Sequence, residues 1–198
     1  MTVLAEVVLF HSVLGLRTGV LGAAERLRKA GHTVHTPDLF DGEVFEDIAK
    51  GRAKFATIGR RGLIERTWSA VQSLPSLLVY GGFSMGGAPA ELLAATRPGA
   101  QGCLLFHAAL PPEAFGISVW PSGVPVQVHY ADRDPYRNQQ WIDRLRESVR
   151  RSGSSFDYFR YPVPGHLFTD AGVTEYNREA DDLVWDRVIR FLERIEKP

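Results

Sequence analysis

The chain has 198 residues, of which 44% are hydrophobic, and this combination suits one folded domain with a sizeable core and excludes a disordered chain. Its 23 lysine and arginine residues are matched by 23 aspartate and glutamate residues. The resulting formal net charge of zero argues against nucleic acid or an acidic membrane surface as the main partner.

The N-terminal segment and the single cysteine bear on where the protein works. The segment MTVLAEVVLFHS has no basic region, and its apolar run is too short for a signal peptide or a membrane span. Cys103 is the only cysteine and lies in the apolar run GCLLF, which is typical of a small buried hydrophobic residue. We therefore expect a cytoplasmic protein without an intramolecular disulfide.

Short β-branched runs alternate with amphipathic stretches along the chain. The pattern predicts strands at 3–10, 33–37, 77–81, 102–107, 124–131 and 156–162. It predicts helices at about 18–30, 85–96, 137–151 and 175–196, and a longer polar-apolar stretch from about 43 to 74. Repeated strand–helix units indicate an α/β fold, a mostly parallel, doubly wound sheet of about six strands with helices on both faces. Because no internal repeat or linker interrupts the pattern, we expect a single domain over 1–198 without a separate lid.

Ligands of such sheets bind outside the carboxyl ends of the strands. Several polar residues follow predicted strands in this way: His11, Ser12, Asp38, Ser84, His107, Asp132, Asp134 and His166. These residues are the first candidates for a functional site.

The stretch YGGFSMGGAPAELLAA, residues 80–95, joins a predicted strand to a predicted helix. Within it, residues 82–86 match the G-x-S-x-G nucleophile elbow, with Ser84 at the centre. Such a turn is so tight that side chains two residues before and after the serine would clash, and Gly82 and Gly86 remove those clashes. A glycine-rich loop of this kind could instead be structural or hold a phosphate, but no nucleotide-binding motif accompanies it. The context favours Ser84 as a nucleophile.

A serine nucleophile needs a histidine base and an acid that orients it, and the elbow fold places them in the order serine, acid, histidine. His166 lies in a loop after the last predicted strand, in the expected place, whereas the positions of His107 and His129 favour structural roles. The acid should follow the preceding strand, where VQVHYADRDPY offers Asp132 and Asp134. Asp134 is favoured because the proline after it fixes a turn.

Taken in order, the motifs VVLFHSVLGL, AGHTVHTPDLFDG, YGGFSMGG, VPVQVHYADRDPY and PGHLF resemble the dienelactone hydrolase family of the α/β-hydrolases over nearly the whole chain. The resemblance implies an α/β-hydrolase fold. It also implies a catalytic triad of Ser84, Asp134 and His166. The family's oxyanion hole corresponds here to two backbone amides, those of Met85 and Val13, where side-chain identity matters little.

Three positions depart from the family pattern. Ser84 stands where the dienelactone enzymes have a cysteine, and Ser12 stands where they have an activating glutamate. Asp170 replaces an arginine that grips the substrate carboxylate in the family. These departures imply an ordinary serine triad. A carboxylate at Asp170 would repel an anion, so we expect a neutral or cationic ester. His11, Ser12 and Asp170 are possible substrate-binding residues.

The pocket roof can come only from residues 43–74 or from the segment PPEAFGISVWPSG. Phe115 and Trp120 in that segment could line an acyl site, although packing against the sheet edge is the favoured interpretation. Arg60 and Arg61 are interpreted as a solvated helix face.

The sequence therefore predicts a serine hydrolase that cleaves a small ester or lactone through an acyl-serine intermediate. No metal or organic cofactor is expected, because no cluster of histidine, cysteine and glutamate has ligand spacing. Two alternatives stay open: a catalytically weak hydrolase fold that serves as a binding protein, and a thioesterase. No oligomeric state is predicted.

Overall fold

The computed structural model describes residues 4–195, so the first residue of the predicted strand 3–10 and the last of the predicted helix 175–196 lie outside the described residues. Six strands form one sheet in which every pair of neighbours is parallel. The strand order is β2 (Thr33–His35), β1 (Glu6–Phe10), β3 (Leu78–Phe83), β4 (Ala100–Phe106), β5 (Val126–Arg133) and β6 (Phe156–Pro164). The predicted α/β fold with a doubly wound sheet of about six strands is confirmed.

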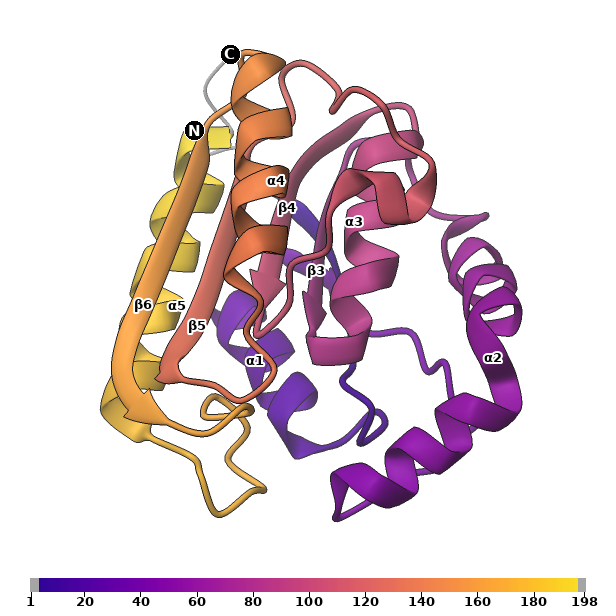
Figure 1. Ribbon diagram of the computed structural model, residues 1–198, viewed down its shortest axis with the longest axis vertical. Coiled ribbons are helices and arrows are strands. Elements are labelled where there is room, and N and C mark those ends of the chain that lie inside the picture. The colour runs from indigo at the N-terminus through magenta and orange to yellow at the C-terminus, as the bar shows by residue number, and fades with distance from the viewer. Residues whose placement is uncertain (1–3, 196–198) are drawn as a thin grey trace.

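Helices cover both faces of the sheet (Figure 1). One face carries α1 (Thr18–Lys29) and α5 (Arg178–Ile195), and the other carries α2 (Ile48–Val71), α3 (Gly87–Thr96) and α4 (Gln139–Arg151). Within residues 4–195, none of the helices combines the length and the apolar character that crossing a membrane requires.

The central strands, β1 among them, contribute side chains to two hydrophobic cores. In β1, Val8 and Phe10 pack in the core beneath α2, α3 and α4, while Val7 and Leu9 pack in the core beneath α1 and α5. All four side chains are fully buried. Because successive strand side chains point to opposite faces, a strand covered on both sides must be apolar throughout, which is why the strands appear as continuous runs.

The order in which successive strands join the sheet changes direction between β1 and β3. It first adds β2 on one side of β1, and then β3, β4, β5 and β6 on the other side. The carboxyl ends of β1 and β3 therefore flank the switch point where open α/β sheets bind ligands. In Figure 1 the strand arrows point towards the lower edge of the molecule, where this site must lie.

The helix α2 occupies most of the predicted stretch 43–74 and lies at the right in Figure 1, bent along its length. Asp47 caps it by accepting a hydrogen bond from the Lys50 amide at 2.8 Å. Gly59 interrupts the helix with a φ of 68° and a ψ of 170°, a conformation that essentially only glycine adopts. The bend divides α2 into two halves that diverge at Gly59.

The segment between β4 and β5 holds a short 3₁₀ helix, η2 (Pro112–Phe115). Trp120 lies beyond it, only 1% exposed, with its indole N–H donating to the Val124 carbonyl at 2.8 Å. Trp120 therefore packs in the core, as favoured from the sequence, and Phe115 is the aromatic of this segment that reaches a cavity.

Candidate active site

The turn after β3 holds Ser84 in a left-handed backbone conformation with a φ of 50°. A Cβ atom on Gly82 would overlap the carbonyl group of Gly86. A Cβ atom on Gly86 would collide with the Phe10 carbonyl and lie 2.6 Å from the carbonyl oxygen of His11. The two glycines are therefore required by sterics, and the strained turn projects the Ser84 hydroxyl beyond the sheet.

The structure brings Ser84, His166 and Asp134 together in a chain of hydrogen bonds. The distance from Ser84 Oγ to His166 Nε2 is 2.6 Å, and that from His166 Nδ1 to Asp134 Oδ2 is 2.8 Å. Because a carboxylate can only accept, Nδ1 carries the ring proton of a neutral His166, and Nε2 is left to accept from the serine hydroxyl. Both His166 and Asp134 are buried.

The two loops that carry the base and the acid are fixed by further hydrogen bonds. The His166 amide donates to Glu175 Oε1 at 3.0 Å, and the Tyr136 amide donates to Asp134 Oδ1 at 2.8 Å. Asp132, the competing acid, forms an ion pair with Arg160 at 2.7 Å near the surface instead. The geometry thus places Asp134, and not Asp132, against the histidine.

Met85 and Val13, the expected oxyanion donors, both line the cavity beside Ser84. Met85 directly follows the serine at the start of the 3₁₀ turn Ser84–Gly86, which leads into α3. The Val13 amide donates to no protein acceptor in the part of the chain that the structure describes. The Val13 carbonyl abuts Gly51 of α2, where a Cβ atom would overlap it. Both residues therefore border the cavity that the serine faces.

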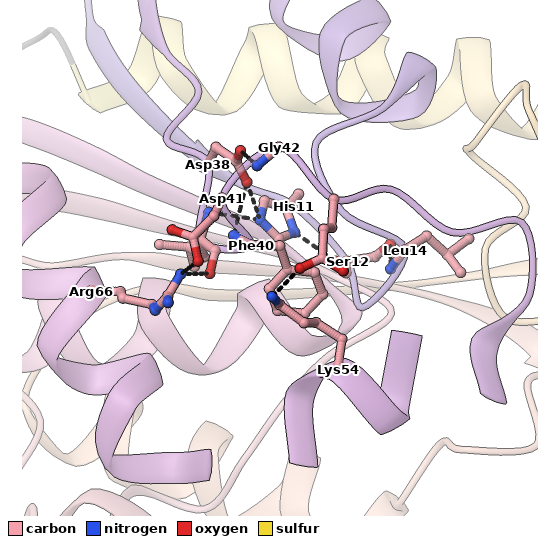
Figure 2. Close-up of polar contacts among 11 residues, drawn as sticks. His11, Ser12, Leu14, Asp38, Phe40, Asp41, Gly42, Lys54 and Arg66 are labelled. Carbon is pink, nitrogen blue, oxygen red and sulfur yellow. Dashed lines mark hydrogen bonds and ion pairs between the residues drawn. The ribbon is translucent and has the colours of Figure 1, made fainter. Parts of the chain in front are cut away.

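His11 and Ser12 do not line that cavity, contrary to the sequence expectation. Figure 2 shows His11 between two loops, where its Nδ1–H donates to the Ser12 carbonyl at 2.7 Å and its Nε2 accepts from the Leu39 amide at 2.9 Å. Burial lowers the pKa of His11, which keeps the ring neutral. Ser12 Oγ accepts from the Leu14 amide at 3.2 Å. Both side chains therefore stabilise the loop after β1 by hydrogen bonds and do not face the cavity.

Asp170 also lies away from the cavity. Its carboxylate is 3.7 Å from Arg17 Nε and accepts from the Gly172 amide at 2.8 Å. A carboxylate that is paired in this way and turned from the cavity cannot repel a bound anion there. The sequence argument for a neutral or cationic substrate therefore loses its basis.

The cavity itself has a volume of about 360 Å³, which is in the range of small-molecule sites. Its walls are mostly apolar. The polar side chains on them are Arg52, Ser84, His107, Tyr130, Tyr136 and His166. Arg52, on α2, is the only permanently charged member among the described lining residues, and within residues 4–195 it has no ion-pair partner. No local motif around Arg52 singled it out in the sequence. In the same described part of the chain, no cluster of acidic, histidine or cysteine side chains could hold a metal ion.

His107, which the sequence assigned a structural role, forms part of the cavity wall. It has a φ of 58°, is 2% exposed, and its Nε2 lies 2.9 Å from Thr169 Oγ1. Burial holds its pKa well below the usual value, so the ring is neutral beside His166, whose centroid lies 5.8 Å away. His107 therefore contributes shape to the wall without adding a charge next to the base.

The loop after His107 is anchored by a buried carboxyl group. Glu91 of α3 is 1% exposed and accepts from the Leu110 amide at 2.9 Å. Burial raises the pKa of Glu91 to about 8, so the carboxyl group is protonated at neutral pH. Leu110 lines the cavity, and Glu91 thereby holds one of its walls from inside the core.

Comparison with known proteins gives a consistent picture. A model described as the dienelactone hydrolase family matches residues 3–196, whereas no curated protein matches the sequence. A promiscuous, dienelactone hydrolase-like phosphotriesterase from metagenomic libraries has 23% identity and a TM-score of 0.77, over 96% of this chain and 86% of its own.

Two more distant structures share the fold. One of two metagenome-derived lipolytic enzymes has 16% identity and a TM-score of 0.64, over 96% of this chain and 94% of its own. The thioesterase domain from the curacin biosynthetic pathway has 14% identity and a TM-score of 0.60, over 93% of this chain and 92% of its own.

Proposed function

Because the chain belongs to the dienelactone hydrolase family and is a hydrolase acting on ester bonds, we propose that it cleaves small esters or lactones through an acyl intermediate on Ser84. The observation that carries the proposal is the unbroken hydrogen-bond chain from Ser84 through His166 to Asp134, at 2.6 Å and 2.8 Å. It begins at a strained turn that exposes the serine to a cavity.

In the first half of the reaction, His166 Nε2 takes the proton of the Ser84 hydroxyl while Oγ bonds to the substrate carbonyl carbon. The negative charge that develops on the carbonyl oxygen is stabilised by the amides of Met85 and Val13. When the tetrahedral intermediate collapses, the bond to the leaving oxygen breaks, and His166 gives that oxygen its proton. The alcohol departs, or in a lactone stays attached to the acyl chain.

In the second half, a water molecule gives a proton to His166 and attacks the acyl carbon. The same two amides stabilise the second oxyanion, and the released proton returns to Ser84 Oγ as the acid leaves. Asp134 holds the Nδ1–H tautomer and stabilises the imidazolium that forms in each step. The proton transfers run through Ser84 and His166, and the Ser84–His166 and His166–Asp134 pairs already lie within hydrogen-bond distance.

The experiment is intact mass after exposure to a fluorophosphonate, with the parent protein, Ser84→Ala and the exposed-serine control Ser118→Ala. We expect one adduct on the parent and on Ser118→Ala and none on Ser84→Ala. Hydrolysis of p-nitrophenyl acetate should fall in step, by on the order of 10³-fold or more in kcat. A folded parent protein that forms no adduct would overturn the proposal and leave the non-catalytic alternative.

The matched pair Asp134→Asn and Asp132→Asn tests the acid. Asn at position 134 would present the wrong hydrogen-bonding pattern to His166, and kcat should drop by roughly 10³- to 10⁴-fold. Asp132→Asn removes only a surface ion pair with Arg160 and should change kcat by less than about threefold. Running acetyl thioesters beside the oxygen esters separates the thioesterase alternative.

A further inference from the structure

A second cavity of about 370 Å³ adjoins the one that contains Ser84. Both are lined by Phe55 and Leu63 of α2, Ala88 of α3, and Leu110, so these four residues lie between the two cavities and are here called the neck. The second cavity, here called the distal chamber, continues between α2 and α3 towards η2. Its walls beyond the neck include Ile64, Leu92 and Phe115.

The wall of the distal chamber carries two polar side chains, Thr67 and Arg60, and its nine other lining residues are apolar. The Thr67 hydroxyl on its wall donates to the Leu63 carbonyl at 2.8 Å, within the same helix. The Arg60 guanidinium donates to the Ala114 carbonyl, across the space between α2 and η2. Because the Thr67 hydroxyl is paired, Arg60 is exposed to solvent and the other nine lining residues are apolar, the chamber suits a hydrocarbon and gives water few partners.

We propose that the distal chamber binds the hydrocarbon tail of the acyl group, so that the preferred substrates are esters of medium-chain acids. The inference rests on the proposed acyl-serine mechanism. If each methylene takes the ~30 Å³ of a liquid water molecule, a chamber of about 370 Å³ holds on the order of ten carbons. Tails of roughly six to ten carbons would fill the neck and the chamber.

The position of His166 decides which arm of the substrate, the acyl arm or the alcohol arm, enters the distal chamber. His166 must give a proton to the leaving oxygen, so the alcohol arm lies on the His166 side, where Tyr136 and Trp141 also line the first cavity. None of these three residues lines the distal chamber. The acyl arm therefore takes the exit through the neck, past Ala88.

The test is kcat/KM on p-nitrophenyl acetate, butyrate, hexanoate, octanoate and decanoate, each kept below its micelle concentration. For the parent protein we expect a rise of roughly threefold per added methylene until the chamber is filled. The blocking variant is Leu92→Trp, because Leu92 lines the distal chamber and not the first cavity. It should lose on the order of fifty-fold on octanoate and stay within about threefold of the parent on acetate.

The matched control is Leu183→Trp, the same substitution on α5 at a side chain that is 43% exposed. It should leave the whole series unchanged. If Leu92→Trp folds poorly, Ile64→Trp fills the chamber from the α2 side and should give the same selective loss. A chain-length profile that is flat in the parent, or unchanged in both blocking variants, would overturn the inference.

Failure of the inference is distinct from failure of the proposed function. Labelling by a short-chain fluorophosphonate and hydrolysis of acetate report on Ser84 alone. If both are present while octyl and ethyl fluorophosphonates label at the same rate, the acyl site is wrong and the serine mechanism stands. If neither is present, the mechanism itself is wrong.

Discussion

Two helices wall the cavities next to Ser84, and they are held in different ways. The helix α3 has 10 residues, of which six are buried: Gly87, Pro89, Ala90, Glu91, Leu93 and Ala94. The helix α2 has 24 residues, of which only four are buried: Gly51, Leu63, Thr67 and Val71. The turn that carries Ser84 therefore leads into a tightly packed helix, whereas the other helical wall of the cavities is loosely packed.

The contrast is sharper between the halves of α2. Three of its four buried residues follow Gly59, and near the end of this second half Arg97 binds the Val71 carbonyl at 3.1 Å and the Leu74 carbonyl at 2.7 Å. The first half has only Gly51 buried, yet it carries Arg52 and Phe55 to the cavities. Substitutions there can change which substrates bind without disturbing the serine.

The largest expected effect on stability and activity comes from Gly86, in the turn that leads into α3. Gly86→Ala would push a methyl group into the carbonyls of Phe10 and His11, and β1 cannot yield because both of its faces are packed. We expect a loss of roughly 2–5 kcal/mol in the free energy of unfolding, with little remaining esterase activity. Urea denaturation and p-nitrophenyl acetate hydrolysis measure the two.

The matched variant is Gly62→Ala in α2, at a half-buried position where the nearest atom to a new Cβ is the Ile58 side-chain methyl Cγ2 at 3.0 Å. It should keep the activity and gain up to about 1 kcal/mol from helix propensity. Equal losses in the two variants would contradict the distinction between the helices.

The tightly packed turn at residues 82–86 and the candidate triad are also the parts of the site that the sequence predicts. Residues 82–86 mark a turn whose glycines are forced by sterics, and the order of strands determines that His166 and Asp134 follow neighbouring strands. A parallel sheet then delivers all three side chains to one edge. Local sterics and topology are both visible in a single sequence, so the candidate triad could be predicted.

The cavity walls could not be predicted in the same way. The roles expected of His11, Ser12 and Asp170 came from their place after a predicted strand or from the family resemblance. Where each side chain points depends instead on contacts with distant residues, Leu39 and Arg17 among them. Arg52 lies in the half of α2 that precedes the bend at Gly59 and lines the cavity through the packing of that half against distant elements. Such tertiary effects leave no local pattern in the sequence.

The buried carboxyl group of α3 makes stability depend on pH. The pKa of Glu91 is raised from 4.5 to about 8 in the folded protein by burial, so the folded state binds more protons than the unfolded chain between those values. Its stabilising contribution is complete below pH 4.5 and is lost as pH rises to about 8. Glu91→Gln, which keeps an acceptor for the Leu110 amide, should be more stable than the parent by roughly 2–4 kcal/mol above pH 8.

Denaturant unfolding of the parent and of Glu91→Gln at a series of pH values tests this sign. The two curves should meet near pH 4.5 and diverge steadily towards pH 8. As a control, Glu65→Gln removes a surface ion pair with Arg61 and should show no such divergence. A parent protein that gained stability relative to Glu91→Gln as pH rose would show that the carboxyl group is ionised in the fold.

A substitution at the bend of α2 should reduce the free energy of unfolding less than one at the turn before α3. Gly59→Ala places a side chain at a φ of 68° and a ψ of 170°, which costs roughly 1–3 kcal/mol, although no atom stands within 4 Å of the new Cβ. The strain can relax by moving the weakly packed first half of the helix. We expect hydrogen exchange to speed up over residues 48–58, acetate hydrolysis to change by less than about threefold, and octanoate hydrolysis to fall more. Faster exchange throughout α3 as well would show that the two helices act as one unit.

The smallest expected effect concerns Arg52, the positively charged residue of α2 that lines the cavity. Arg52 is exposed and lacks an ion-pair partner among the described residues, so a carboxylate on the substrate would gain an attraction largely screened by water, worth about 0.2–1 kcal/mol. Arg52→Gln should therefore lower kcat/KM for 4-acetoxybenzoate by up to about fivefold and leave the neutral 4-acetoxybenzamide unchanged. Added salt should shrink the difference between the two substrates in the parent and do nothing in the variant. Since both substrates share the same acetyl group and the same serine, an equal loss on both would mean that Arg52 supports the shape of α2 and not the charge of the site.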